Sequence, residues 1–222
     1  MAEPAWRKNE SKNSGGANVV SCSMKTLLLG FFLLAGMIHA AGFKSGWDRQ
    51  NDADWIGPEY WANPMEDWKL AKGRIECVRQ GGDRNVHLLT HQLGNKDGDF
   101  TTSVVVGRAD AGKGAGSVGF RVGIRSDLGD YRSALLFGKG LDAGLTTGGS
   151  LFIGGASAKL DAPVPETVKL ELKLQGNQLT LTAIDPSTGK SLGGTTAKAG
   201  DLSGSVALVN NHAARKGRGG AG

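Results

Sequence analysis

The chain has 222 residues and a formal net charge of +5, and 36 of its residues are glycine, about twice the usual share. This length suits one large domain, and glycines outside any G-X-Y repeat indicate many turns and exclude a collagen-like chain. The positive charge does not predict nucleic-acid binding, because residues 41–212 hold 19 basic and 19 acidic side chains and the excess lies at the two ends.

The first 41 residues divide into two parts. Residues 1–23 are polar without apolar periodicity, so we expect them to be disordered. Residues 24–41 combine Lys25, an apolar run over 27–38 and a small-residue exit, which is typical of a secretory signal peptide. The run is short for a membrane span, although a signal anchor or buried helix is the alternative. We therefore expect a true start at Met24, a secreted or periplasmic protein, and no stable membrane span after cleavage.

The cysteines do not form a disulfide framework. Cys22 precedes the signal peptide and is lost with it, which leaves Cys77 alone in the mature chain. Cys77 lies in a strand-like segment, so a buried structural thiol is expected rather than a nucleophile or a disulfide.

Residues 47–68 are rich in tryptophan and in acidic side chains. The rings are expected to form a flap packed against the rest of the domain, with a stacking platform for sugars as the alternative. The acidic residues offer oxygen ligands to a structural Ca²⁺, but no EF-hand spacing is present, and no other cofactor is expected. The tryptophans are Trp47, Trp55, Trp61 and Trp68.

From Gly73 onward the chain alternates apolar and polar residues in short runs separated by turn residues. The clearest runs are 100–106, 168–174 and 179–183, with a hairpin signal at 175–178. Alternation buries one face of each strand, and two packed antiparallel sheets bury all these faces together. We therefore predict that residues 42–212 form one all-β, antiparallel two-sheet sandwich.

The segment Gly116–Lys139 is the strongest candidate for a functional surface. Its first half alternates four apolar residues, the last of which is Ile124, with glycines and with Arg121 and Arg125. This pattern predicts a strand with one buried face and an open, cationic opposite face. Tyr131 and Arg132 follow a turn, and the apolar run 134–137 is interpreted as the return strand.

Catalytic patterns are weak. His87 and His91 would share one zinc on a helix, but four residues of a strand span roughly 13 Å, which is too far. A glycosidase needs two carboxylates across a cleft, whereas Asp142 is the one acid in a glycine-rich loop beside the basic face. No other catalytic motif is found, so no catalytic residue is assigned.

Two sets of segments resemble known families. Residues 168–192 and 204–212 resemble the last strands of concanavalin A-like, or laminin G-like, jelly rolls. Further segments resemble the N-terminal module of secreted bacterial PhoD-like alkaline phosphatases and phosphodiesterases, over residues 47–212 as a whole. These are 60–77 (YWANPMEDWKLAKGRIEC), 84–94 (RNVHLLTHQLG), 119–132 (GFRVGIRSDLGDYR) and 138–154 (GKGLDAGLTTGGSLFIG).

The resemblance implies a jelly-roll sandwich that precedes a metallophosphoesterase domain. No motif of that catalytic domain occurs in this sequence, so the resemblance transfers no catalytic residue. It also implies one more aromatic-rich strand after residues 206–212, whereas 213–222 has the composition of a disordered basic tail. We therefore interpret the chain as a fragment or truncated product, with an exposed sheet edge.

These observations predict a secreted, non-catalytic accessory module that binds a glycan or polyol, or that supports a metallophosphoesterase domain. One alternative is a stand-alone jelly-roll glycoside hydrolase or lyase that depends on Asp142, and another is a purely structural interdomain module. The predicted ligand-binding residues act by charge-assisted hydrogen bonds and ring stacking. They are Arg121, Arg125, Tyr131, Arg132 and Asp142.

Overall fold

The computed structural model describes residues 42–94, 98–108 and 114–212. The disordered prefix, the signal peptide and the basic tail, predicted for 1–23, 24–41 and 213–222, lie outside the described residues. Within the described ranges, no helix is both long enough and apolar enough to cross a membrane.

Short antiparallel strands make up most of the described chain, and each begins or ends near a glycine or polar turn. One α-helix and two 3₁₀ helices accompany them in these ranges: α1 (Tyr131–Phe137), η1 (Trp47–Arg49) and η2 (Met65–Asp67). The strands are β1 (Tyr60–Asn63), β2 (Trp68–Ala71), β3 (Arg74–Cys77), β4 (Gly81–Leu93), β5 (Phe100–Gly107), β6 (Gly116–Arg125), β7 (Lys139–Thr146), β8 (Ser150–Ile153), β9 (Ala156–Lys159), β10 (Thr167–Gln175), β11 (Gln178–Ile184), β12 (Ser191–Lys198) and β13 (Gly204–His212).

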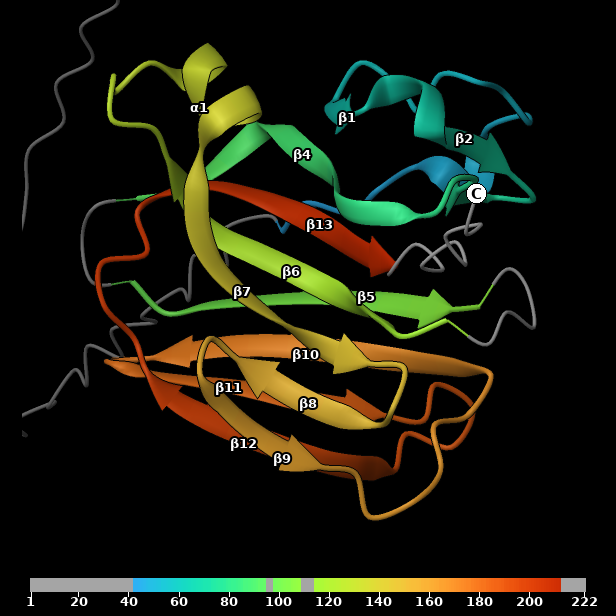
Figure 1. Ribbon diagram of the computed structural model, residues 1–222, viewed down its shortest axis with the longest axis vertical. Helices are drawn as coiled ribbons and strands as arrows, with labels where there is room; N and C mark the ends of the chain where they lie inside the picture. Colours follow the sequence, from blue (N-terminus) through green and yellow to red (C-terminus); the bar gives the residue numbers. More distant parts are fainter. Residues whose placement is uncertain (1–41, 95–97, 109–113, 213–222) are drawn as a thin grey trace, which may run out of the picture. The chain divides into compact units, whose positions relative to one another are not determined.

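The strands form two principal sheets. A seven-stranded sheet has the order β1-β4-β13-β6-β7-β8-β9, and a four-stranded sheet has the order β12-β11-β10-β5 (Figure 1). Strands β2 and β3 form a separate hairpin, and every pairing is antiparallel. The predicted all-β, antiparallel two-sheet sandwich is therefore confirmed.

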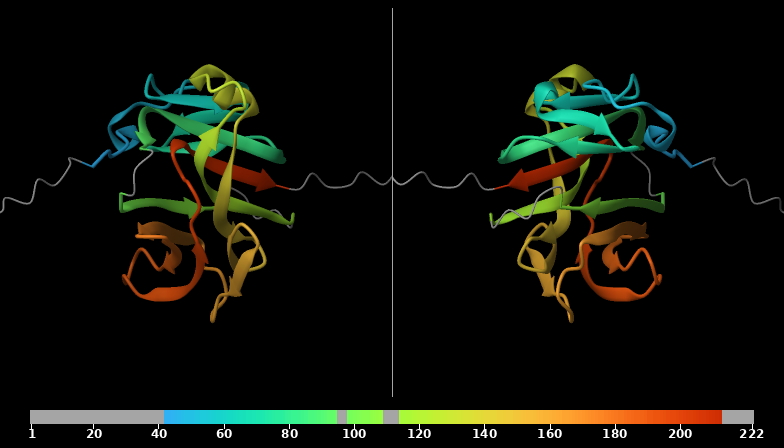
Figure 2. Two further views of the ribbon diagram at one scale, coloured as in Figure 1. Left: turned by 90° about the vertical axis from the view of Figure 1, so that its left-hand side faces the viewer. Right: turned by 90° about the vertical axis from the view of Figure 1, so that its right-hand side faces the viewer.

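The main core lies between the two sheets. Leu170 and Leu172 of β10 and Leu179 of β11 are fully buried and belong to the same cluster as Phe120 of β6 and Leu151 of β8. Figure 2 shows the orange strands β10–β12 facing β8 and β9 across this core. Each such side chain stabilises the fold by about 1.5–3 kcal/mol relative to an exposed one, so period-two alternation explains the sandwich.

A second, smaller core lies under the N-terminal segment. Trp47 packs on Tyr60 with ring centroids 4.6 Å apart, and Trp68 is buried in the same cluster. The predicted flap is confirmed for these two rings, whereas Trp55 and Trp61 remain exposed.

Cys77 is half-buried and packs against the second core, so the predicted buried thiol is borne out only in part. Its Sγ lies 3.4 Å from the Arg79 carbonyl oxygen, to which it donates, and it is a free cysteine. The structural reason is that β3 belongs to the peripheral β2–β3 hairpin and not to either principal sheet.

The predicted return strand over residues 134–137 is wrong, because these residues end helix α1. The Asp130 carboxylate accepts a hydrogen bond from the Arg132 backbone N–H at 3.1 Å and caps the helix N-terminus. Ala134 and Leu135 are the buried residues of the helix, while the following Leu136 and Phe137 are exposed. A four-residue apolar run suits a strand or a helix equally well, and the cap decides for the helix.

The predicted common face for Arg121 and Arg125 is also wrong. Three residue steps on β6, from 121 to 124, match two steps on β13, and the same extra residue occurs against β7. This is a β-bulge, with Gly123 at φ +66°. The bulge turns Ile124 to the same face as Arg121, where it packs under α1, and turns Arg125 to the opposite face.

Replacement of Gly123 by alanine should destabilise the protein by about 1–3 kcal/mol. Alanine here would have to adopt the left-handed backbone conformation of Gly123, and its Cβ would lie 2.9 Å from Leu202 Cα. Urea unfolding measures the loss, with Gly200→Ala as the control, because a Cβ at Gly200 meets nothing within 4 Å. Equal unfolding free energies for the two variants would contradict the bulge.

Candidate functional site

The candidate site lies on the outer face of the seven-stranded sheet, which is the face turned away from the four-stranded sheet. The strand registers align Trp61, His87, Ala207, Arg121 and Asp142 in one row across β1, β4, β13, β6 and β7. Phe120, next to Arg121, belongs to the core between the sheets, so this row faces outward. Helix α1 covers part of the face.

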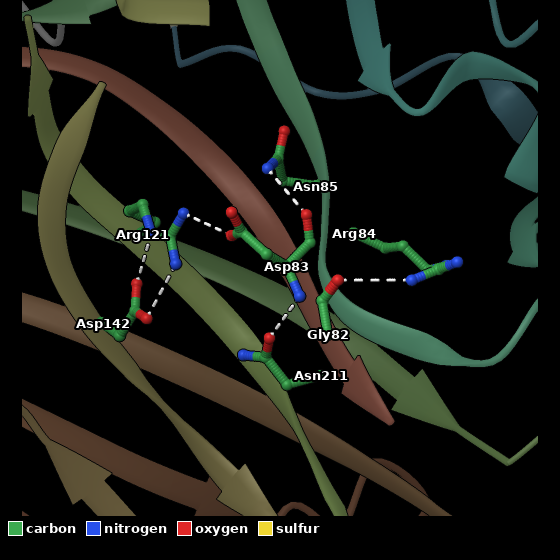
Figure 3. A network of polar contacts seen from close by, with 7 residues as sticks. All are labelled: Gly82, Asp83, Arg84, Asn85, Arg121, Asp142 and Asn211. Carbon is green, nitrogen blue, oxygen red and sulfur yellow. Dashed lines mark hydrogen bonds and ion pairs between the residues drawn. The ribbon is translucent and has the colours of Figure 1, made fainter. Parts of the chain in front are cut away.

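Arg121 is the centre of an ion-pair network on this face (Figure 3). Its Nε and Nη2 donate to Asp142 Oδ1 and Oδ2 at 2.6 and 3.0 Å, and its Nη1 donates to Asp83 Oδ1 at 2.7 Å. Only 16% of its side chain is exposed, and the bond to Asp142, above all, raises the pKa of the guanidinium. The predicted open cationic face is therefore wrong at Arg121, because two carboxylates compensate this charge.

Asp83 reaches Arg121 across an intervening strand. Asp83 is on β4 and Arg121 on β6, and β13 lies between them, so their ion pair passes over the outward-facing Ala207 and Val209, which are both buried. Asp83 itself is held at φ +57°, and its backbone N–H donates to Asn211 Oδ1 at 2.6 Å. The network therefore connects three strands besides β13.

A cleft of 340 Å³, called the first cleft below, opens beside this network. The end of α1 and the start of β7 form one wall, on which Leu136 and Phe137 are 54% and 74% exposed. The cleft thus combines charged hydrogen-bonding groups on the floor with apolar side chains on the wall. Its lining residues are Asp83, Arg121, Leu136, Phe137, Gly138, Lys139 and Gly140.

The structure brings together two of the five predicted ligand-binding residues, Arg121 and Asp142. Arg125, displaced by the bulge, instead donates to Asp201 Oδ2 at 2.7 Å and to Ser203 Oγ at 3.1 Å. Its charge is therefore also compensated, and it lies apart from the first cleft.

Tyr131 and Arg132 occupy the first turn of α1 and do not line the first cleft. The Tyr131 hydroxyl is buried without a hydrogen-bond partner in the described part of the chain, and burial raises its pKa. Arg132 is exposed, and its Nε lies 3.7 Å from Asp130 Oδ2. Both residues therefore lie outside the first cleft, and their predicted role in ligand binding stays a prediction.

Sequence reasoning missed Asp83 and Phe137. Asp83 follows two glycines at the start of the long strand 81–93, and it was not among the predicted site residues. Phe137 was assigned to the return strand 134–137, and its exposure follows from the helical path of α1. The available signal was the Asp130 cap, which predicts a helix beginning at Tyr131.

The two histidines do not meet. His87 is 3% exposed on β4, whereas His91 is exposed and its ring packs against Phe43 in a tilted arrangement, with centroids 5.0 Å apart. Among the residues that the structure describes, no three His, Cys, Asp or Glu side chains gather where a metal ion would bind. Several acids of the tryptophan-rich segment have protein partners, such as Asp67 with Arg84 at 2.6 Å. A structural Ca²⁺ stays a prediction.

His87 predicts a pH-dependent stability. Burial, assisted by the charge of Arg121 and opposed by that of Asp83, lowers the His87 pKa from 6.5 to about 4. The folded protein therefore binds this proton less readily than the unfolded chain. The contribution of neutral His87 to the free energy of unfolding is fully present above about pH 6.5. It is lost as the pH drops toward about 4, by roughly 3 kcal/mol in total.

Urea unfolding across this pH range measures the loss. His87→Gln should remove most of the slope between about pH 6.5 and about pH 4, while the exposed His91→Gln should retain it. The same slope in wild type and His87→Gln would show that another group causes it.

The comparisons with known proteins concern the fold alone. No family model matches the chain, and no curated protein matches it. Among solved structures, the carbohydrate-binding module CBM66 from Bacillus subtilis aligns at 15% identity and a TM-score of 0.36, covering 60% of this chain and 82% of that one. Lectin II from Ulex europaeus aligns at 12% identity and a TM-score of 0.44, covering 73% and 90%. The carbohydrate binding stated in the name of the first structure is a property of that protein.

Proposed function

We propose that this chain is a non-catalytic accessory module that binds an uncharged glycan or polyol in the first cleft. The observation that supports this most is the fixed Asp83–Arg121–Asp142 network beside the exposed ring of Phe137. Such a combination matches a sugar, which has hydroxyl groups around its edge and apolar C–H groups on its faces.

The floor offers hydrogen-bond acceptors in fixed positions. The Asp83 side chain is 68% exposed, and only its Oδ1 is engaged by a side chain within the described residues. Sugar hydroxyls donate to carboxylate oxygens in short, charge-assisted bonds. Because Arg121 already holds both carboxylates, little side-chain entropy is lost when a ligand binds.

The wall offers an apolar surface. Phe137 and Leu136 lie at the end of α1 beside the cleft, and more than half of each residue is exposed to water. Aromatic rings at a polar cleft gain free energy when they cover the apolar face of a ligand. The residue proposed for ring stacking is therefore Phe137, in place of Tyr131, which the sequence predicted.

The charges favour an uncharged ligand over an anionic one. Arg121 is compensated by two carboxylates, and an anion in the cleft would face Asp83 directly. Lys139 is the other cation among the lining residues, and it is exposed, so water and salt screen it. Like charges brought together at a binding surface are costly.

Binding is proposed in preference to hydrolysis because of Asp142. Both of its carboxylate oxygens accept hydrogen bonds from Arg121, so neither is free to transfer a proton to a glycosidic oxygen. The proposed context is extracellular or periplasmic, supported by the signal-peptide pattern of residues 24–41. An accessory role beside a metallophosphoesterase domain is supported by the PhoD-like resemblance of residues 47–212.

Phe137→Ala should weaken binding of a neutral polysaccharide by about tenfold, because a stacked ring contributes on the order of 1–1.5 kcal/mol. Isothermal titration calorimetry of residues 24–222, as processed by the secreting host, measures this with laminarin, xylan and inulin as neutral probes. Alginate and polygalacturonate are the anionic probes, and we expect them to bind more weakly.

The control is Leu128→Ala, which removes an exposed apolar side chain from the turn before α1, outside the first cleft. It should bind as the wild type does. The proposal fails if no neutral glycan binds, if anionic polymers bind better, or if Phe137→Ala and Leu128→Ala have equal affinities.

A further inference from the structure

A second cleft, of 390 Å³, opens beside the first. Asn211 and Ser117 lie on it, and both alternate with inward-facing residues along β13 and β6, so they share the outer face with Arg121. The function proposed above makes no use of this cleft. Its lining residues are Gly82, Ala115, Gly116, Ser117, Thr146, Asn211 and His212.

The two clefts lie along the same strands. Ser117 and Thr146 face each other across β6 and β7, as do Arg121 and Asp142 four residues further along. Four residues of a strand span about 13 Å, and an even number of residues keeps the side chains on one face. The distance exceeds the width of one sugar ring, so a single ring cannot occupy both positions.

The floor between the clefts carries no side chains on β6 and β7. The intermediate outward-facing pair is Gly119 and Gly144. A Cβ on Gly119 would lie 2.1 Å from the Ala143 carbonyl oxygen, and one on Gly144 would lie 2.4 Å from that of Val118. Close strand approach therefore requires glycine at both positions, so β6 and β7 place no side chain between the two clefts.

Asn211 couples the clefts directly. Its Oδ1 accepts the Asp83 backbone N–H at 2.6 Å, so a lining residue of the second cleft holds a floor residue of the first. Within the described ranges, the Asn211 Nδ2 and the Ser117 hydroxyl have no hydrogen-bond partner. The second cleft thus has a free amide donor and a free hydroxyl.

We infer that the ligand is a chain of sugar units that lies across both clefts, with the second cleft as a further subsite. This inference rests on the proposed function and makes it more specific. A polysaccharide is then bound along its length, and affinity rises with the number of units until both clefts are filled.

Calorimetry with neutral oligosaccharides of increasing length, prepared from whichever of laminarin, xylan or inulin binds, tests the inference. Ser117→Gln introduces a long side chain into the second cleft without touching the first. It should lower the affinity for long oligosaccharides by about tenfold, the cost of one or two lost hydrogen bonds, and leave that for disaccharides unchanged. Ser103→Gln, an exposed position on β5 of the other sheet, is the matched control. Thermal unfolding compares the folding of both variants.

The outcomes separate the two proposals. The second subsite is overturned, and the first cleft kept, if the wild-type affinity does not depend on chain length. The same holds if Ser117→Gln binds long oligosaccharides normally while Phe137→Ala does not. A loss in Ser117→Gln that is equal for disaccharides and long oligosaccharides also overturns it. No binding of any oligosaccharide or polysaccharide overturns both.

Discussion

The guanidinium of Arg121 is the interaction on which the outer face depends. It joins β6 to β7 through Asp142 and reaches over β13 to Asp83 on β4. A partly buried cation of this kind is tolerated because two of its donors pair with the Asp142 carboxylate and a third donates to Asp83. Loss of one partner would leave a charge poorly solvated, so the three side chains form one structural unit. The same unit presents the Asp83 carboxylate to the first cleft.

The surroundings of this unit follow from backbone features nearby. The bulge at Gly123 sends Ile124 to the outer face, where Ala134 of α1 packs on it together with Ala207. This contact places the end of α1 beside Arg121 and exposes Phe137 at the cleft. A polar floor and an apolar wall therefore arise from one extra residue in β6 and one helix cap at Asp130.

The sheets could be predicted from the sequence, and the site only in part. Alternation along 168–174 and 179–183 specifies strands because burial of one face repeats every second residue. The face of Arg125 could not be read in this way, because one residue of bulge reverses every later side chain. Asp83 was not recognised because its partner is 38 residues away and reaches it across another strand. Short apolar runs such as 134–137 are ambiguous until their caps are considered.

Nuclear magnetic resonance tests the central claim most directly, which is that the Arg121 network forms the floor of a site for an uncharged glycan. The ¹⁵N spectrum is followed during titration with a neutral polysaccharide fragment, observing the Arg121 Nε–H and the backbone amides of Asp83, Phe137 and Lys139. The account predicts that these signals shift together and saturably, while those of the outer face of β10 and β11 do not. Shifts confined to the four-stranded sheet, or an Arg121 Nε–H that stays in place while binding occurs, would contradict it.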